Sequence, residues 1–472
     1  MSSEYYRIDE HVLDASHIRG FPRTTSTTQE EVLKLAIKQY TPLNNTSPKP
    51  GDITIIAAHA NAFPKELYEP LWDDLLKISK QQNFGIRGIW IADVAHQGQS
   101  GILNEDKLGN DPAWLDHSRD LLHMVNTFRA QMPRPIIGIG HSMGGAQLTY
   151  LALIHPRLFE TLVLIDPVLQ KEVNFSGNVS PADASANRRD RWPSREEAAK
   201  GMLRNKFYQA WDRRVFDRWI QFGLRDLPTE LYPDESSSPS SSNPTASTAL
   251  PATVTTEPTA TPAPSQPKQV TLTTTKHHEV MTFLRPNFAF RPGVDSEPSS
   301  STYSVANPTA INRRTHPDLF QTQVPQSPFY RGESMMVFRL LPHLRPSVLY
   351  IFASESSLTT DPTAIPEKMA RTGTGDGGSG GEKEGRVVKV MVQDAGHLIP
   401  MEKVEETASH AAKWIGNEMG RWREDEQKSE AEWGTKKGRE RRVLTERFVE
   451  ELRNMKKLNA SGKKTASGGS KL

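Results

Sequence analysis

The strongest chemical signal in the sequence is a serine held between glycines, in Gly140-His141-Ser142-Met143-Gly144. A short apolar run at 136–139 precedes it as a predicted strand, and a predicted helix over 145–154 follows it. The turn from such a strand to such a helix is so tight that the flanking positions need glycine, and it raises the serine hydroxyl above the sheet. Short glycine motifs also arise by chance, but this one has the strand and the helix that its chemistry requires. We therefore predict that Ser142 is a nucleophile.

A serine hydroxyl needs a base, and His397 is the best placed of the fourteen histidines. It lies in Gly396-His397-Leu398-Ile399-Pro400, between the last predicted strand, 387–392, and a predicted helix. A histidine at that point overlies the carboxyl ends of the strands, within reach of Ser142. The other histidines fall in turns or within helices, where structural and surface roles are commoner. His397 is therefore the predicted base.

The acid that orients this histidine is left open between two carboxylates. The usual place is after the strand before the histidine, but there the run 348–352 leads into Ala353-Ser354-Glu355-Ser356, with a serine at the acid position. Glu355 comes one residue earlier and has a longer side chain. Asp166 ends an undisturbed predicted strand, 162–165, although an Asp-Pro turn is also a common structural feature. We predict Asp166, with Glu355 as the alternative, and either keeps the chain order serine, acid, histidine.

Acyl transfer at a serine also needs two fixed N–H donors for the oxyanion that develops on the substrate. One donor is expected to be the backbone N–H of Met143, the residue after the nucleophile. The other is expected at Asn61, in the loop His59-Ala60-Asn61-Ala62-Phe63-Pro64 that follows the first predicted parallel strand.

Alternating strands and helices are predicted to position these residues. The helices include 68–80, 115–131 and 404–415, and the strands are short apolar runs at 53–58, 86–91, 136–139, 162–165, 348–352 and 387–392. Runs that are apolar on both faces suit parallel strands covered by helices on each side. The pattern predicts an α/β fold with a mostly parallel, doubly wound sheet, whose site lies at the carboxyl ends of its strands.

Composition divides the 472 residues into four parts. Residues 1–169 and 346–416 are predicted to form the two portions of the α/β core. Residues 170–345 interrupt the alternation and are predicted to form a helical cap. Within the cap, a Ser-, Thr- and Pro-rich insertion at about 234–312 is expected to be disordered, because it has little apolar surface to bury. Residues 417–472 are predicted to form a charged helical tail.

Composition also excludes several classes of protein. The chain has no cysteine, which excludes disulfides, thiolate metal sites and a cysteine nucleophile. Its 58 basic and 56 acidic residues nearly balance, which argues against nucleic acid as a partner. No run reaches the roughly 18 apolar residues of a membrane-spanning helix, so no membrane span is expected. We expect no metal and no cofactor.

The sequence given ends in Ser470-Lys471-Leu472, after a basic stretch rich in glycine, serine and lysine. At a free C-terminus this tripeptide is the peroxisomal address that a soluble import receptor reads. We therefore expect that receptor as a partner and the peroxisomal matrix as the location.

Together these motifs resemble the α/β-hydrolase superfamily, over about residues 50–170 and 330–416. The loop at 58–64, taken with the terminal tripeptide, is similar to fungal peroxisomal hydrolases, a group that includes a peroxisomal lipase and enzymes of toxin biosynthesis. The resemblance implies a cofactor-independent serine hydrolase of the esterase or lipase type, acting on an acyl ester or thioester. An epoxide hydrolase or dehalogenase is disfavoured, because those enzymes have a carboxylate where Ser142 stands. The alternative is a non-catalytic or biosynthetic member of the same fold.

Overall fold

The computed structural model describes residues 2–172, 175–234, 268–286, 317–318 and 329–466. The chain divides into two compact units, Met1–Gly416 and Asn417–Leu472, and each is described by itself. Most of the predicted insertion at 234–312 lies outside the described residues, apart from Asp234 and the segment 268–286.

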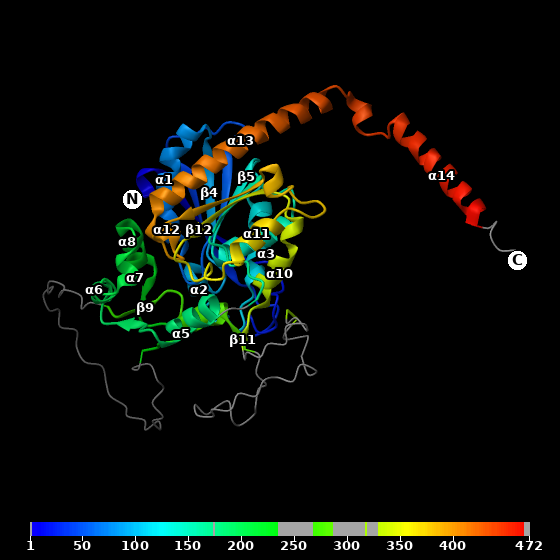
Figure 1. Cartoon of the computed structure of the whole chain (residues 1–472). Coiled ribbons are helices and arrows are strands. Elements are labelled where there is room, and N and C mark those ends of the chain that lie inside the picture. Colours follow the sequence, from blue (N-terminus) through cyan, green and yellow to red (C-terminus); the bar gives the residue numbers. More distant parts are fainter. Residues whose placement is uncertain (1, 173–174, 235–267, 287–316, 319–328, 467–472) are drawn as a thin grey trace, which may run out of the picture. The chain divides into compact units, whose positions relative to one another are not determined.

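Within the described part of the first unit, the central element is an eight-stranded sheet with the order β1-β2-β4-β3-β5-β6-β12-β13 (Figure 1). Its strands are β1 (Tyr6–Asp14), β2 (Lys34–Pro42), β3 (Ile53–Ala58), β4 (Ile86–Ala92), β5 (Ile136–His141), β6 (Thr161–Ile165), β12 (Ser347–Ala353) and β13 (Val387–Val392). From β4 to β13 all neighbouring strands are parallel, whereas β1 and β2 are antiparallel additions at one edge. The predicted mostly parallel sheet is confirmed.

Helices cover both faces of this sheet, which explains why β3, β5, β6 and β12 are buried along their whole length. One face packs against α3 (Trp114–Thr127), α4 (Met143–Ile154) and α10 (Gly332–Leu340) in a continuous apolar cluster. The other face is covered by α1 (Glu69–Ser79) and by the first part of α13 (Val404–Gly434) (Figure 1). Because both faces of these strands are buried, apolar residues are favoured at every position, and the strands were predicted from these continuous apolar runs.

The antiparallel hairpin of β1 and β2 was not predicted from the sequence. In β1, exposed and half-buried positions alternate, and charged residues such as Arg7, Asp9 and Glu10 break the apolar character of the run. An edge strand with one solvated face carries a weaker apolar signal than a central strand.

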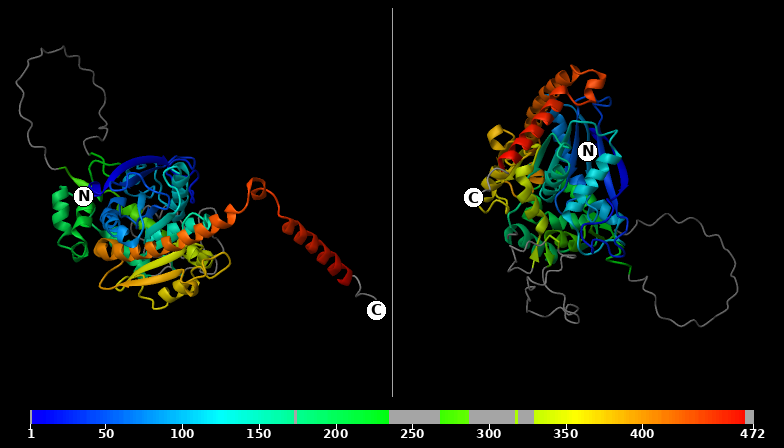
Figure 2. Two further views of the ribbon diagram at one scale, coloured as in Figure 1. Left: turned by 90° about the horizontal axis from the view of Figure 1, so that it is seen from above. Right: turned by 90° about the vertical axis from the view of Figure 1, so that its right-hand side faces the viewer.

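The described residues between 175 and 286, which make up most of the described part of the cap region 170–345, lie at the lower left of the core in Figure 1 and toward its lower edge in the right-hand view of Figure 2. By contrast, α10 packs on the sheet as part of the apolar cluster. The described parts of the cap region include a small antiparallel sheet with the order β7-β9-β8 and a pairing of β10 with β11. Their elements are α5 (Ser180–Asn187), β7 (Arg191–Trp192), α6 (Arg195–Met202), α7 (Lys206–Gln209), α8 (Arg213–Phe222), β8 (Leu224–Asp226), β9 (Val270–Leu272), α9 (Lys276–Phe283), β10 (Arg285–Pro286) and β11 (Phe329–Tyr330). The remaining short elements of the first unit are α2 (Gly98–Leu103), α11 (Ala364–Arg371), α12 (Ile399–Glu402) and the helical turns η1 (Ser2–Glu4), η2 (Lys65–Tyr68), η3 (Lys80–Gln82), η4 (Phe175–Val179), η8 (Leu341–His343) and η9 (Glu382–Glu384).

Strand register brings the carboxyl ends of β5, β6, β12 and β13 to one edge of the sheet. His141 pairs with Ile165, and Ala353 pairs with Val392. Two further hydrogen bonds continue the ladder beyond the strands. The N–H of Ser142 donates to the carbonyl of Ile165 over 2.9 Å, and the N–H of Asp166 donates to the carbonyl of Ile351 over 2.7 Å. The residues that follow these strands are therefore held side by side.

The second unit contains the rest of α13, the turn η10 (Gly438–Arg441) and α14 (Glu446–Ala466). The terminal Ser470, Lys471 and Leu472 lie outside the described residues. Across the described ranges, no helix combines the length and apolar character needed to cross a bilayer.

Candidate active site

Ser142 lies in a strained turn between β5 and α4. Its φ of 56° and ψ of −118° place a non-glycine residue in a region that side chains rarely adopt. The chain can turn this sharply because Gly140 and Gly144 lack side chains. A Cβ on Gly144 would lie 2.2 Å from the carbonyl oxygen of Ala58, and one on Gly140 would lie 2.7 Å from that of Gly144. The glycines therefore let α4 approach β3 closely, and the serine is placed at the top of the sheet.

His397 lies between β13 and α12 and contacts both of its expected partners. Its Nε2 lies 2.7 Å from the hydroxyl oxygen of Ser142, and its Nδ1 lies 2.6 Å from Oδ2 of Asp166. Ser142 is only 6% exposed, whereas the histidine side chain is 29% exposed. The structure thus brings Ser142, His397 and Asp166 into one hydrogen-bonded row. In this order a neutral imidazole can take the serine proton while the carboxylate holds the ring.

Asp166 follows β6, and its φ of 36° turns the chain immediately after the strand. Its carboxylate is fully buried and aimed at the histidine. Glu355, the alternative acid, is not part of the row. Its side chain is exposed, and its contact with the histidine loop is a backbone one, an N–H donated to the carbonyl of Ala395 over 3.0 Å. Of the two candidate acids, only Asp166 contacts His397.

Ser356 contacts the row as well, a role that the sequence analysis did not assign to it. Its hydroxyl donates to Oδ2 of Asp166 over 2.5 Å, and its side chain is buried. This is the position after β12 at which register had placed a serine instead of the usual acid. Ser356 therefore contacts Asp166, the carboxylate that follows the neighbouring strand β6 and accepts from His397. It does so as a hydrogen-bond donor.

Two loops supply candidates for the oxyanion donors. Met143 opens α4, and the first N–H groups of a helix have no partner within the helix. The side chain of Asn61 is already engaged, because it donates to the carbonyl of Glu279 in α9 over 3.0 Å and accepts from Gln97 over 2.7 Å. Its backbone N–H is therefore the group that could act as the donor. The side chain instead fastens the loop to the cap.

The buried His59 orients the peptide that carries this N–H. Its Nε2 accepts from the N–H of Val94 over 2.9 Å, so its Nδ1 carries the proton and donates to the carbonyl of Ala60 over 2.7 Å. Burial lowers the pKa of His59, which keeps the ring neutral in this arrangement. In a trans peptide the N–H points opposite to the C=O. The N–H of Asn61 therefore points away from His59.

Lys368 is a buried cation close to the acid. It belongs to α11, and its amine donates to the carbonyl of Pro167 over 3.3 Å and lies over the ring of Phe352. Burial lowers the pKa of Lys368 from 10.5 to about 8, against an opposing effect of the Asp166 charge. Below pH 8 the folded chain must keep a charged amine in an apolar site.

This cost predicts a pH-dependent gain in stability when Lys368 is replaced by methionine. Between pH 8 and 10.5 the unfolded chain binds more protons than the folded chain, so wild-type stability rises with pH across that window. Lys368→Met should therefore increase the free energy of unfolding by about 3 kcal/mol at pH 7, with the gain shrinking as pH approaches 10.5. Urea unfolding at several pH values measures it, with Lys389→Met, at an exposed position of β13, as the control. A gain that is independent of pH would contradict this explanation.

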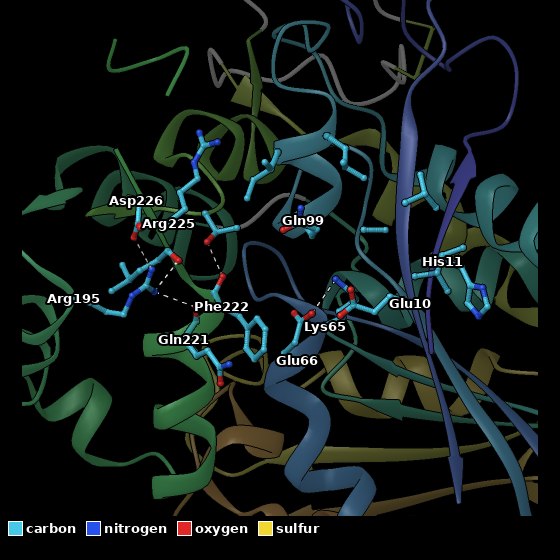
Figure 3. Close-up of a pocket in the computed structure, with 17 residues that line it drawn as sticks. Glu10, His11, Lys65, Glu66, Gln99, Arg195, Gln221, Phe222, Arg225 and Asp226 are labelled. Carbon is cyan, nitrogen blue, oxygen red and sulfur yellow. Dashed lines mark hydrogen bonds and ion pairs between the residues drawn. The ribbon is translucent and has the colours of Figure 1, made fainter. Parts of the chain in front are cut away.

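A cavity of about 500 Å³ lies apart from the row, between the core and the cap (Figure 3). Its lining does not include Ser142, His397 or Asp166. Its basic groups already have partners. Lys65 pairs with Glu66, Arg195 donates to the carbonyls of Ile220, Gln221 and Leu224, and Arg225 forms a two-pronged pair with Glu105. We therefore assign this cavity no part in the chemistry of the site.

Comparison with known proteins gives a family match and relatives of similar length. The model of the alpha/beta hydrolase family matches residues 55–410. The type I acyl-CoA thioesterase mpaH of Penicillium roqueforti (strain FM164) is 42% identical over 461 residues, which cover 96% of this chain and 97% of the relative. The protein of the same name from Penicillium brevicompactum is 43% identical over 431 residues, covering 90% and 91%.

A solved structure supports the same architecture. The peroxisomal alpha-beta-hydrolase Lpx1 of Saccharomyces cerevisiae aligns over 99% of both chains, with a TM-score of 0.58 and 14% sequence identity. At this identity the likeness concerns the fold alone.

Proposed function

Because the chain belongs to the alpha/beta hydrolase family, we propose that it is a serine-dependent hydrolase of acyl thioesters. The family match confirms the fold and the resemblance that the sequence indicated. The observation that carries the proposed chemistry is the row in which His397 lies 2.7 Å from Ser142 and 2.6 Å from Asp166. The thioester preference is supported by the two Penicillium relatives, which are named acyl-CoA thioesterases.

In the proposed reaction, His397 Nε2 takes the hydroxyl proton as Ser142 Oγ attacks the acyl carbonyl carbon. The N–H groups of Met143 and Asn61 hold the resulting oxyanion. When the carbon–sulfur bond breaks, His397 returns the proton to the departing thiolate. A water molecule then attacks the acyl-enzyme, with His397 again as base, and the products are a carboxylic acid and a free thiol.

Release of thiol from acyl-CoA substrates tests this proposal. The wild-type protein should hydrolyse acyl-CoA thioesters faster than p-nitrophenyl esters of the same acyl chains, and Ser142→Ala should release no thiol above the uncatalysed rate. Hydrolysis of the esters alone would contradict the thioester assignment. A folded wild-type protein inactive on both classes would favour the alternative, a non-catalytic member of the fold.

We also propose that the protein acts in the peroxisomal matrix. Support comes from Ser470-Lys471-Leu472, which an import receptor reads at a free C-terminus. A fluorescent protein fused to the N-terminus should collect in peroxisomes of fungal cells, and removal of Leu472 should leave it in the cytosol. Peroxisomal signal that persists without Leu472 would contradict a receptor-read tripeptide.

A further inference from the structure

A buried tyrosine lies between the two loops that the proposed reaction uses. Tyr68 ends η2, and only 2% of it is exposed. Its hydroxyl oxygen lies 2.8 Å from the backbone nitrogen of Ala60, which belongs to the loop 59–64 that carries the proposed oxyanion donor (the oxyanion loop). The same oxygen lies 2.8 Å from Nδ1 of His141, the residue before the nucleophile. His141 Nε2 in turn lies 3.0 Å from the carbonyl oxygen of His397. Three hydrogen bonds therefore connect the oxyanion loop to the loop of the base.

The direction of every bond in this chain follows from the chemistry of its ends. A carbonyl oxygen only accepts, so His141 Nε2 carries a proton and donates it to His397. Burial, and then the nearby His397, lower the pKa of His141 to about 3, so the ring is neutral and its Nδ1 is an acceptor. Tyr68 must donate to that nitrogen, and its oxygen is left to accept the N–H of Ala60. Burial raises the pKa of Tyr68, so its hydroxyl keeps the proton that it donates.

Each end of the chain fixes a part of the site. At one end, Tyr68 holds the N–H of Ala60 while His59 holds the carbonyl of the same residue, so the two successive peptides that flank Ala60 are both restrained, and the second of them presents the N–H of Asn61. At the other end, His141 holds the backbone of His397, and the two imidazole rings lie 5.3 Å apart. A shift of either loop would change the distance from Ser142 to its base or from the substrate to its oxyanion donors.

We infer that Tyr68 and His141 are positioning residues, which act together to keep the oxyanion loop and the base in register with Ser142. The inference rests on the proposed function. Neither side chain touches the reacting atoms, since both act through the backbone of Ala60 and His397. A misplacement of about 1 Å at a reacting centre can cost about 10²-fold in rate, so the loss of this chain should be visible in catalysis.

Tyr68→Phe tests the inference, because it removes the shared hydroxyl and keeps the ring. The matched control is Tyr6→Phe, which removes another buried tyrosine hydroxyl, one that donates to the carbonyl of Trp72 over 2.7 Å away from the row. The rate of labelling by a fluorophosphonate probe should fall about 10- to 100-fold in Tyr68→Phe and stay within about twofold of wild type in Tyr6→Phe.

A pair of ketone inhibitors separates positioning from general damage. A long-chain trifluoromethyl ketone adds to the serine and forms an oxyanion, whereas the methyl ketone of the same chain length binds largely without addition. Tyr68→Phe should weaken the trifluoromethyl ketone at least about tenfold and leave the methyl ketone unchanged, because the lost hydroxyl serves the transition-state geometry. Equal weakening of both inhibitors, or a loss of labelling that Tyr6→Phe shares, would overturn the inference.

Variants of His141 test the second half of the chain. Glutamine can present an amide N–H near the position of Nε2, so His141→Gln should keep the bond to His397 and label at least about tenfold faster than His141→Ala. Equal rates in these two variants would overturn the role of His141. An unlabelled wild-type protein would instead contradict the proposed function, whereas a labelled wild type with an equally fast Tyr68→Phe would contradict this inference alone.

Discussion

Replacing Ser142 by alanine is expected to abolish acyl hydrolysis while the protein stays folded. The hydroxyl is the attacking group, and its oxygen lies 2.7 Å from His397 Nε2. In a serine hydrolase, loss of the nucleophile costs about 10⁶-fold in kcat. The change removes one oxygen atom from the strained turn, so thermal melting should stay within a few degrees of wild type by the usual cost of such changes.

His397→Ala should produce a loss of similar size, and the double variant should be hardly worse than either single one. Serine and base act as one proton-transfer unit, so their contributions are strongly non-additive. Steady-state kinetics on an acyl-CoA and on a short acyl ester measure all three proteins. Either single variant turning over at a near wild-type rate would remove that residue from the proposed mechanism, and additive losses would show that the two side chains act separately.

Asp166→Asn is expected to lower kcat by about 10⁴-fold, as loss of the corresponding carboxylate does in serine proteases. Oδ2 of Asp166 accepts from His397 Nδ1 over 2.6 Å and from the hydroxyl of Ser356 over 2.5 Å. If the amide nitrogen of the asparagine took the position of Oδ2, its N–H groups would face the donors of His397 Nδ1 and of the Ser356 hydroxyl, and both hydrogen bonds would be lost. An amide oxygen there would restore the contacts but could not stabilise the imidazolium by charge. The variant should therefore fold and bind substrate with a kcat that is strongly reduced.

Glu355→Gln is the matched control, since it removes the charge of the other candidate acid from an exposed side chain. It should hydrolyse acyl-CoA at close to the wild-type rate. The two variants are compared at several pH values with the same substrate. A crippled Glu355→Gln beside an active Asp166→Asn would reverse the assignment and leave Asp166 as a structural turn.

The central strands and the positions of Ser142 and His397 could be predicted because strong local signals mark them. The run 53–58 matches β3 residue for residue, since burial on two faces demands uninterrupted apolar residues. The run 387–392 matches β13, an edge strand buried only at its two end residues, which was marked by its β-branched valines. The glycines around Ser142 mark a turn that other residues cannot adopt, because side chains at Gly140 and Gly144 would collide with backbone. Such signals need no knowledge of the rest of the chain.

The features that could not be predicted depend on contacts between distant segments. Asp166 and Glu355 follow neighbouring strands, so the sequence favoured Asp166 only because its predicted strand is undisturbed, whereas in the structure the distance to His397 distinguishes the two carboxylates. Nothing near Ser356 or Tyr68 in the sequence shows what their hydroxyls contact. His141 was set aside as a turn residue, and its two bonds reach segments about 70 and 250 residues away.

The central claim, that Ser142 is an activated nucleophile, is tested most directly by mass spectrometry after reaction with a fluorophosphonate probe. The folded wild-type protein should gain a single equivalent of the probe, on the peptide that contains Ser142. Ser142→Ala should gain none, and His397→Ala should react far more slowly, because the probe requires a serine whose proton can be removed. An unmodified wild-type protein, or a label that maps to another residue and persists in Ser142→Ala, would contradict the claim.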